Sequence, residues 1–189
     1  MILRQTARTG VFTLAVSTMV VSLAQAQTET FTATAAVKSA AAATASAPIT
    51  IVIERKTAQA DADRLAETLK TGGAPALRKA LAGVPPTGTV QLGGGAATPT
   101  KLTIERTTDK GRLLTIVADQ PLLFLGASVP GAKPKEGYDF AIIDIEIDAK
   151  GGGAGTLAPA AKIAFKQGTF VVEDYGAELV RLTAVKKTK

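Results

Sequence analysis

The sequence predicts an α+β protein that is mainly antiparallel β, folded as a sandwich or a partly closed barrel, with an inserted two-helix hairpin. Three observations predict this fold class. Short segments rich in β-branched and apolar residues recur along the chain, separated by glycine- and proline-rich turn signals. One stretch changes from a period of two residues to a period near four, which indicates helix. Finally, strands joined by tight turns must pair antiparallel, because parallel neighbours need long crossovers.

The first 26 residues have the three parts of a bacterial signal peptide. Arg4 and Arg8 give a positively charged start, residues 11–23 are mostly apolar, and residues 24–26 have the small-x-small form that signal peptidase cleaves. A retained membrane anchor is the alternative. It fits less well because the apolar stretch contains serine and threonine and is shorter than the ~20 residues of a spanning helix.

We therefore expect cleavage near Ala26 and a periplasmic or secreted mature protein. Residues 27–189 are expected to form a single β-rich domain with a helical insert at about 58–83. The most apolar later segment, residues 140–147, is interrupted by two acids, so no transmembrane segment is expected in the mature chain.

Composition excludes several classes of site. The 189 residues include 22 Lys and Arg, 16 Asp and Glu, and neither cysteine nor histidine, for a net charge of +6. Loss of the signal peptide removes two arginines and no acid, which leaves a charge of +4. Without cysteine there are no disulfides or thiolate metal sites, and without histidine the usual base of a catalytic triad is missing. Basic residues gather only at residues 186–189, so nucleic acid is not an expected partner.

Residues 31–37 and 49–55 predict the first β-hairpin, because apolar and β-branched residues alternate or run together in both. The tract between them, residues 39–48, is rich in Ala, Thr and Ser. It can be a flexible linker or strand with small side chains. We expect Pro48 at the entry to the second strand, where a missing amide hydrogen is tolerated.

A helical insert is predicted over residues 58–83. The apolar residues of its first helix share one face: Ala62, Leu65, Ala66 and Leu69. The glycine pair at residues 72–73 is expected to end this helix, Pro75 suits the first turn of a second one, and Gly83 ends that in turn. The result would be a two-helix hairpin among strands.

The rest of the chain predicts further strands joined by turns. They are expected at residues 89–92, 101–107, 113–118, 122–125, 138–148, 156–165, 169–173 and 179–185. The strongest turn signal is the Asp-Lys-Gly run at residues 109–111. A break or bulge is expected at Pro159, because proline cannot donate to a β-ladder.

Three carboxylates, Asp144, Glu146 and Asp148, alternate with isoleucines and so share one face of a predicted strand. They are the candidate metal ligands, or the carboxylates of a glycosidase, since both uses need several acidic oxygens close together. The alternative is the exposed face of a half-buried strand whose isoleucines point inward.

The loop at residues 128–137 is longer than a hairpin needs, and such loops often carry binding residues. Its candidate ligand-binding residues are Ser128, Lys133 and Lys135, together with Tyr138 just beyond it. Two lysines near a tyrosine would suit an acidic small molecule. The alternative is a solvated connection stiffened by prolines. Ser128 and Lys133 lack the Ser-x-x-Lys spacing, so no catalytic residue is expected here.

Several short motifs resemble a family of small exported bacterial proteins of unknown function. They are Leu-Lys-Thr-Gly-Gly at residues 69–73, the Ala-Leu pairs within residues 76–81, Gly-Tyr-Asp at 137–139 and Glu-Asp-Tyr at 173–175. The motifs are turns and helix ends. The resemblance therefore implies a shared fold and supplies no catalytic residue.

The sequence thus predicts an exported, noncatalytic module that binds a small molecule or a protein partner and needs no cofactor. The alternative is a carboxylate-dependent hydrolase, glycan-cleaving or metal-assisted, that uses the acidic strand. An apolar cavity with a few polar groups would favour a small-molecule site, whereas an exposed apolar patch over a solid core would favour a protein partner.

Overall fold

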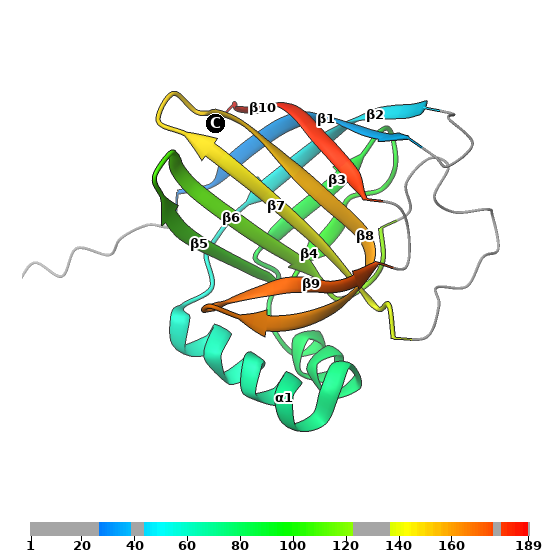
Figure 1. The fold of residues 1–189 in the computed structure, drawn as a ribbon, viewed down its shortest axis with the longest axis vertical. Helices are drawn as coiled ribbons and strands as arrows, with labels where there is room; N and C mark the ends of the chain where they lie inside the picture. The colour runs from blue at the N-terminus through cyan, green and yellow to red at the C-terminus, as the bar shows by residue number, and fades with distance from the viewer. Residues whose placement is uncertain (1–26, 39–43, 123–136, 176–178, 189) are drawn as a thin grey trace, which may run out of the picture.

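The computed structural model describes residues 27–38, 44–122, 137–175 and 179–188. Within them, ten strands form one antiparallel sheet that curls into a nearly closed barrel, and one helix lies against its outside (Figure 1). The strands are β1 (Glu29–Lys38), β2 (Thr44–Ile53), β3 (Gly88–Leu92), β4 (Thr98–Thr100), β5 (Leu102–Thr108), β6 (Gly111–Ala118), β7 (Phe140–Asp148), β8 (Gly152–Lys166), β9 (Thr169–Tyr175) and β10 (Val180–Lys187). The predicted class of mainly antiparallel β-structure is confirmed, and of the two predicted arrangements the sheet has the barrel form.

The strand order around the sheet is β4-β3-β2-β1-β10-β8-β7-β6-β5, and β9 pairs with β8 beside this path. Strands β1 and β10, from the two ends of the described chain, pair directly and join the two halves of the sheet. Between the edge strands β4 and β5, the N–H of Lys101 donates to the carbonyl of Val117 at 2.8 Å. The N–H of Thr57 also donates to the carbonyl of Thr103 on β5 at 2.7 Å. The segment that follows β2 thus covers part of the β5 edge of the sheet.

The predicted hairpins β1–β2 and β5–β6 are confirmed as antiparallel pairs. Pro48, however, lies inside β2 opposite Thr34 and not at the strand's entry. Its carbonyl accepts the N–H of Gly93 at 2.7 Å, so the end of the small-residue tract is strand and not linker. The bulge expected at Pro159 is present, since the β7–β8 register shifts there by one residue.

The helical insert differs from the prediction. The described residues form one helix, α1 (Gln59–Ala82), in place of the two-helix hairpin. It is kinked at Gly73, whose φ of 69° and ψ of −170° are open to glycine and not to residues with a side chain. Pro75 follows within the same helix, so no turn segment separates two helices. Within the described residues, no helix is both long and apolar enough to cross a membrane.

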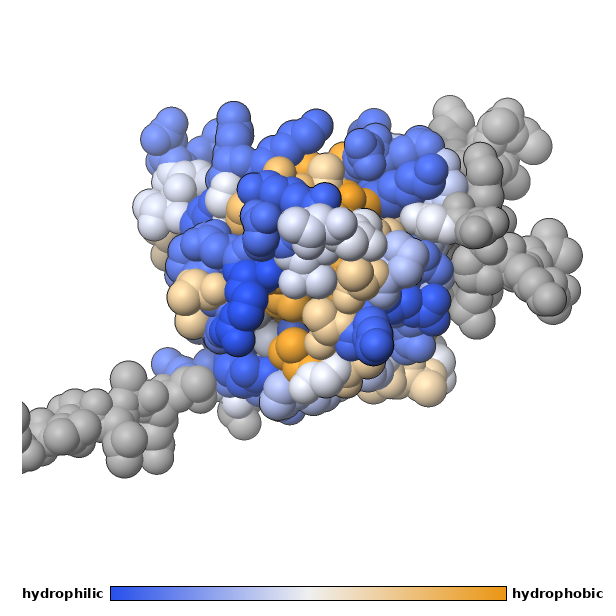
Figure 2. Space-filling model, turned by 90° about the horizontal axis from the view of Figure 1, so that it is seen from below, coloured by the Kyte–Doolittle hydropathy of each residue, from blue (hydrophilic) through white to orange (hydrophobic). Residues whose placement is uncertain are grey.

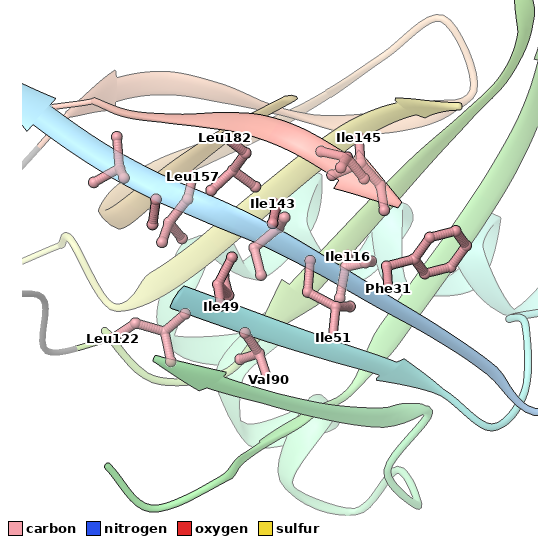
Figure 3. Packing of buried hydrophobic residues seen from close by; sticks show 14 of the residues in the cluster. Phe31, Ile49, Ile51, Val90, Ile116, Leu122, Ile143, Ile145, Leu157 and Leu182 are labelled. Atoms are coloured by element: carbon pink, nitrogen blue, oxygen red, sulfur yellow. The ribbon is translucent and has the colours of Figure 1, made fainter. Parts of the chain in front are cut away.

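Two apolar clusters hold the fold together. The first fills the barrel interior, where side chains from opposite walls point toward one another (Figure 3). Its labelled members are Phe31, Ile49, Ile51, Val90, Ile116, Leu122, Ile143, Ile145, Leu157 and Leu182. The second lies between the outer face of the sheet and α1, and it includes Leu65, Leu77, Phe140 and Phe170. Burial of these faces is the main stabilising contribution for a chain without disulfides.

A cluster of ion pairs joins strand ends at one end of the barrel. Arg112 donates to both carboxylate oxygens of Glu29, at 2.7 and 3.0 Å, and Lys187 donates to Glu29 at 2.8 Å. Arg112 also contacts Glu105 at 2.8 Å, and Lys56 contacts Glu105 at 2.6 Å. We call these five residues the ion-pair cluster. Because Glu29 begins β1 and Lys187 ends β10, the cluster fastens the first and last described strands together.

Candidate functional site

Of the predicted loop site, only Tyr138 lies among the described residues. Ser128, Lys133 and Lys135 lie outside them. Tyr138 is 3% exposed, its hydroxyl donates to Asp174, and the ammonium of Lys162 lies 5.1 Å from its ring centre. The hydrogen bond to Asp174, helped by burial, raises the pKa of Tyr138 above its usual value. These contacts hold Tyr138 in the packing between β7, β8 and β9.

The acidic strand is β7, and its alternation is as predicted. Ile143, Ile145 and Ile147 point into the barrel and are buried, while the three carboxylates lie on the outer face. Asp148 is exposed and accepts hydrogen bonds from the backbone N–H groups of Lys150 and Gly152, at 2.8 and 3.0 Å. This carboxylate therefore orders the turn between β7 and β8.

The other two carboxylates have separate partners. The hydroxyl of Thr115 donates to Asp144 at 2.6 Å, and that of Thr108 donates to Glu146 at 3.1 Å. Burial raises the pKa of Asp144, although the Thr115 hydrogen bond and the charge of Arg106 oppose the shift. In the described part of the chain, no group of three or more acidic side chains is placed to hold a metal ion together. The metal role of β7 stays a prediction.

A groove that the sequence did not predict lies outside the barrel, beside α1. It has a volume of about 580 Å³. Its lining residues come from the segment after β2, from the start of α1 and from the end of α1: Arg55, Lys56, Thr57, Ala58, Asp61, Arg64, Leu65, Thr68, Ala80, Gly83, Val84 and Pro85. Residues on both sides of the Gly73 kink line the same space, so the kink brings the two ends of α1 to face each other.

The floor of the groove is apolar and its walls carry charge. Leu65 is buried, and Val84 and Ala80 are half-buried. Arg55 reaches across to the loop after α1, where its Nε donates to the carbonyl of Pro86 at 3.0 Å and its Nη2 donates to the carbonyl of Pro85. Seen from the α1 side, the molecular surface shows apolar atoms near the middle, surrounded by hydrophilic residues (Figure 2).

The other three charged residues among the described lining residues, Lys56, Asp61 and Arg64, are all ion-paired. Lys56 contacts Glu105, as described above, and Arg64 pairs with Asp61 one helical turn earlier. The sequence gives no signal for this site, because its residues are separated by up to 30 positions and meet only through the kink. Arg55 and Lys56 stand out only as two basic residues immediately after a predicted strand.

A second hollow, of about 410 Å³, lies at the kink of α1 where it meets the β8–β9 hairpin. It is lined by Leu69, Lys70, Gly73, Ala74, Gly137, Lys162, Ile163, Ala164, Phe165 and Glu173. Two lysines and one glutamate are its charged members. Lys162 lies over the ring of Tyr138, and Lys70 pairs with Glu67, so both lysines of this hollow are already engaged.

Comparison of the chain with protein-family models, curated proteins and solved structures finds no match. The resemblance to small exported bacterial proteins therefore stays a prediction.

Proposed function

We propose that this protein is an exported, noncatalytic binding module that holds a small molecule in the groove beside α1. The observation that carries the proposal is the groove itself. Its volume of about 580 Å³ falls within the roughly 300–1,000 Å³ typical of small-molecule sites. An apolar floor with a few polar groups on the walls is also the usual make-up of such sites.

The chemistry of the groove supports binding over catalysis. Asp61 is the one carboxylate among the described residues that line the groove. It is paired with Arg64 and half-exposed, which is not the buried environment typical of a general base. The chain contains no histidine or cysteine to act as base or nucleophile. Arginine and lysine side chains next to an apolar surface are suited to binding a ligand, and binding of this kind requires no chemical reaction.

The alternative, a carboxylate-dependent hydrolase, has one observation in its favour. A buried acid with a raised pKa, such as Asp144, is typical of a general acid. Such an enzyme needs a second carboxylate facing the first across the substrate. Glu146, two residues further along the same face of β7, does not have that position. We therefore prefer the binding module.

Native mass spectrometry of the protein purified from the periplasm of its own host tests the proposal. We expect a mass excess under native conditions that disappears on denaturation, and a mature N-terminus near Gln27. Thr68→Phe, which places a ring in the groove, is the matched variant and should lose the excess. A bare mass for the unmodified protein, or the same excess in Thr68→Phe, would contradict the proposal. A retained residue 1 would contradict export.

A further inference from the structure

The groove beside α1 carries more positive than negative charge. Three of its lining residues are basic, namely Arg55, Lys56 and Arg64, and one, Asp61, is acidic. Asp61 compensates Arg64, and Glu105, which lies outside the groove, compensates Lys56. Arg55 differs from both, because no carboxylate among the described residues lies within ion-pair distance of it.

Arg55 is held in place by neutral groups. It donates to the carbonyls of Pro85 and Pro86, which position the guanidinium but do not neutralise it. The N–H groups on its Nη1 make no hydrogen bond within the described residues. A fixed arginine with unused donors suits a carboxylate or sulfonate, because the planar guanidinium offers paired N–H groups in the spacing of two anionic oxygens.

A second uncompensated cation lies behind the same wall. The ammonium of Lys101 donates to the carbonyl of Val84 at 3.0 Å, and it too lacks a carboxylate partner among the described residues. Lys101 is half-buried, so water screens its charge less than that of an exposed lysine. Both cations thus donate to carbonyls of the loop that follows α1, which forms one wall of the groove.

The floor of the groove, in contrast, is apolar. Leu65, Ala80 and Val84 offer no hydrogen-bonding side chains, so a purely polar anion such as inorganic phosphate would leave this surface without a partner. A molecule with an apolar body and one anionic group would meet both surfaces at once. The volume of the groove suits one such small molecule and not a folded protein segment.

We infer that the ligand of the groove is a small organic anion with an apolar body, whose charged group is received by Arg55. This inference rests on the proposed binding function and specifies its ligand class. The apolar body lies against Leu65, Ala80 and Val84. Arg64, at the other wall, adds a weaker attraction because it is exposed and already paired with Asp61.

A pair of dyes that differ only in charge tests the inference. 1-Anilinonaphthalene-8-sulfonate is an apolar anion, and N-phenyl-1-naphthylamine has the same body without the sulfonate. Both become fluorescent in apolar sites, and the chain has no tryptophan to interfere. Each dye is titrated into the mature protein, and the ratio of the two affinities isolates the contribution of the negative charge.

Arg55→Gln removes the positive charge of Arg55 from the groove, and Lys79→Gln is its matched control. Lys79 is an exposed basic residue of α1 that does not line the groove. We expect Arg55→Gln to weaken binding of the anion about fivefold relative to the neutral dye, and Arg64→Gln to weaken it less. Arg55→Lys should restore most of the preference, and added salt should reduce it. Circular dichroism of each variant confirms that it is folded.

The outcomes separate the two proposals. If Thr68→Phe abolishes binding of both dyes but Arg55→Gln and Arg64→Gln affect them equally, the groove binds ligands and the inference about charge is wrong. If Thr68→Phe changes neither affinity, the dyes bind elsewhere, and both the groove and the inference are wrong. Weaker binding of the anionic dye alone in Arg55→Gln, with both affinities unchanged in Lys79→Gln, supports both proposals.

Discussion

Replacing Glu29 with glutamine should destabilise the folded protein at neutral pH and much less near pH 2. Glu29 is the centre of the ion-pair cluster, and its side chain is 9% exposed. Burial alone would raise its pKa, but hydrogen bonds from Arg112 and Lys187 outweigh burial and lower the pKa from 4.5 to about 2. Glutamine keeps the size of the side chain and loses the charge that both cations require.

The magnitude follows from that pKa. A carboxylate whose pKa is about 2 in the folded state and 4.5 in the unfolded state contributes roughly 3 kcal/mol at neutral pH. Arg112 and Lys187 are 24% and 34% exposed, so solvent screening reduces the contribution, and we expect about 2 kcal/mol. Because the folded pKa is lowered, the contribution is complete above pH 4.5 and is lost as the pH falls toward 2.

Urea denaturation followed by circular dichroism measures this difference at several pH values between 7 and 2.5. The control is Glu54→Gln, which makes the same change in net charge at an exposed position without an ion pair among the described residues. It should alter the free energy of unfolding by less than about 0.5 kcal/mol. If Glu29→Gln matches this control at pH 7, or if its effect is constant down to pH 2.5, the cluster does not stabilise the barrel as described.

Two further predictions concern the paired strands β7 and β8. Gly155→Ala should destabilise the protein by about 1 to 3 kcal/mol, because the new Cβ would lie 2.2 Å from the carbonyl oxygen of Asp144 on β7. Gly94→Ala, whose Cβ meets nothing within 4 Å, is the control in thermal denaturation, and equal melting temperatures would refute the clash. The second prediction concerns Asp144→Asn. We compare its free energy of unfolding with that of the unmodified protein, and this difference should favour the variant more at pH 7 than at pH 3. Burial raises the pKa of Asp144 in the folded protein. The unmodified protein therefore loses free energy of unfolding as the pH rises through that pKa, whereas the asparagine variant has no charge to bury and does not. If the stability of Asp144→Asn relative to the unmodified protein is the same at both pH values, or is lower at pH 7 than at pH 3, this sign is wrong.

The sequence predicted most of the described strands, because alternation and turn signals are local. Of the strand expected at residues 122–125, Leu122 is not in a strand and residues 123–125 lie outside the described residues. The β5–β6 hairpin follows from a three-residue turn signal, and the bulge at Pro159 follows from one missing amide hydrogen. Strand β4 escaped prediction, since three residues that include a proline are too few to show a period. The barrel itself was one of two alternatives. The pairing of β1 with β10 decides between them, and no local pattern encodes contacts between segments so far apart.

The candidate site was predicted less well, for a related reason. Carboxylates on β7 are conspicuous in the sequence because they alternate, but alternation shows only that they share a face. Their partners, such as Thr115 on β6, are set by strand register. The groove residues are inconspicuous for the opposite reason, because Arg55 and Pro86 come together only in the folded chain.

The kink in α1 connects the fold to the proposed function. A straight helix with the length of α1 would carry residues 80–85 far from residues 55–58, and the groove would have one wall. Gly73 has the one backbone conformation in α1 that is not helical, and it returns the second part of the helix toward the first. The guanidinium of Arg55 then ties the loop after α1 to the segment before it. The contact that joins the two walls of the groove is thus made through Nε and Nη2 of the residue to which we assign the ligand's charge, and its Nη1 is left to donate to the anion.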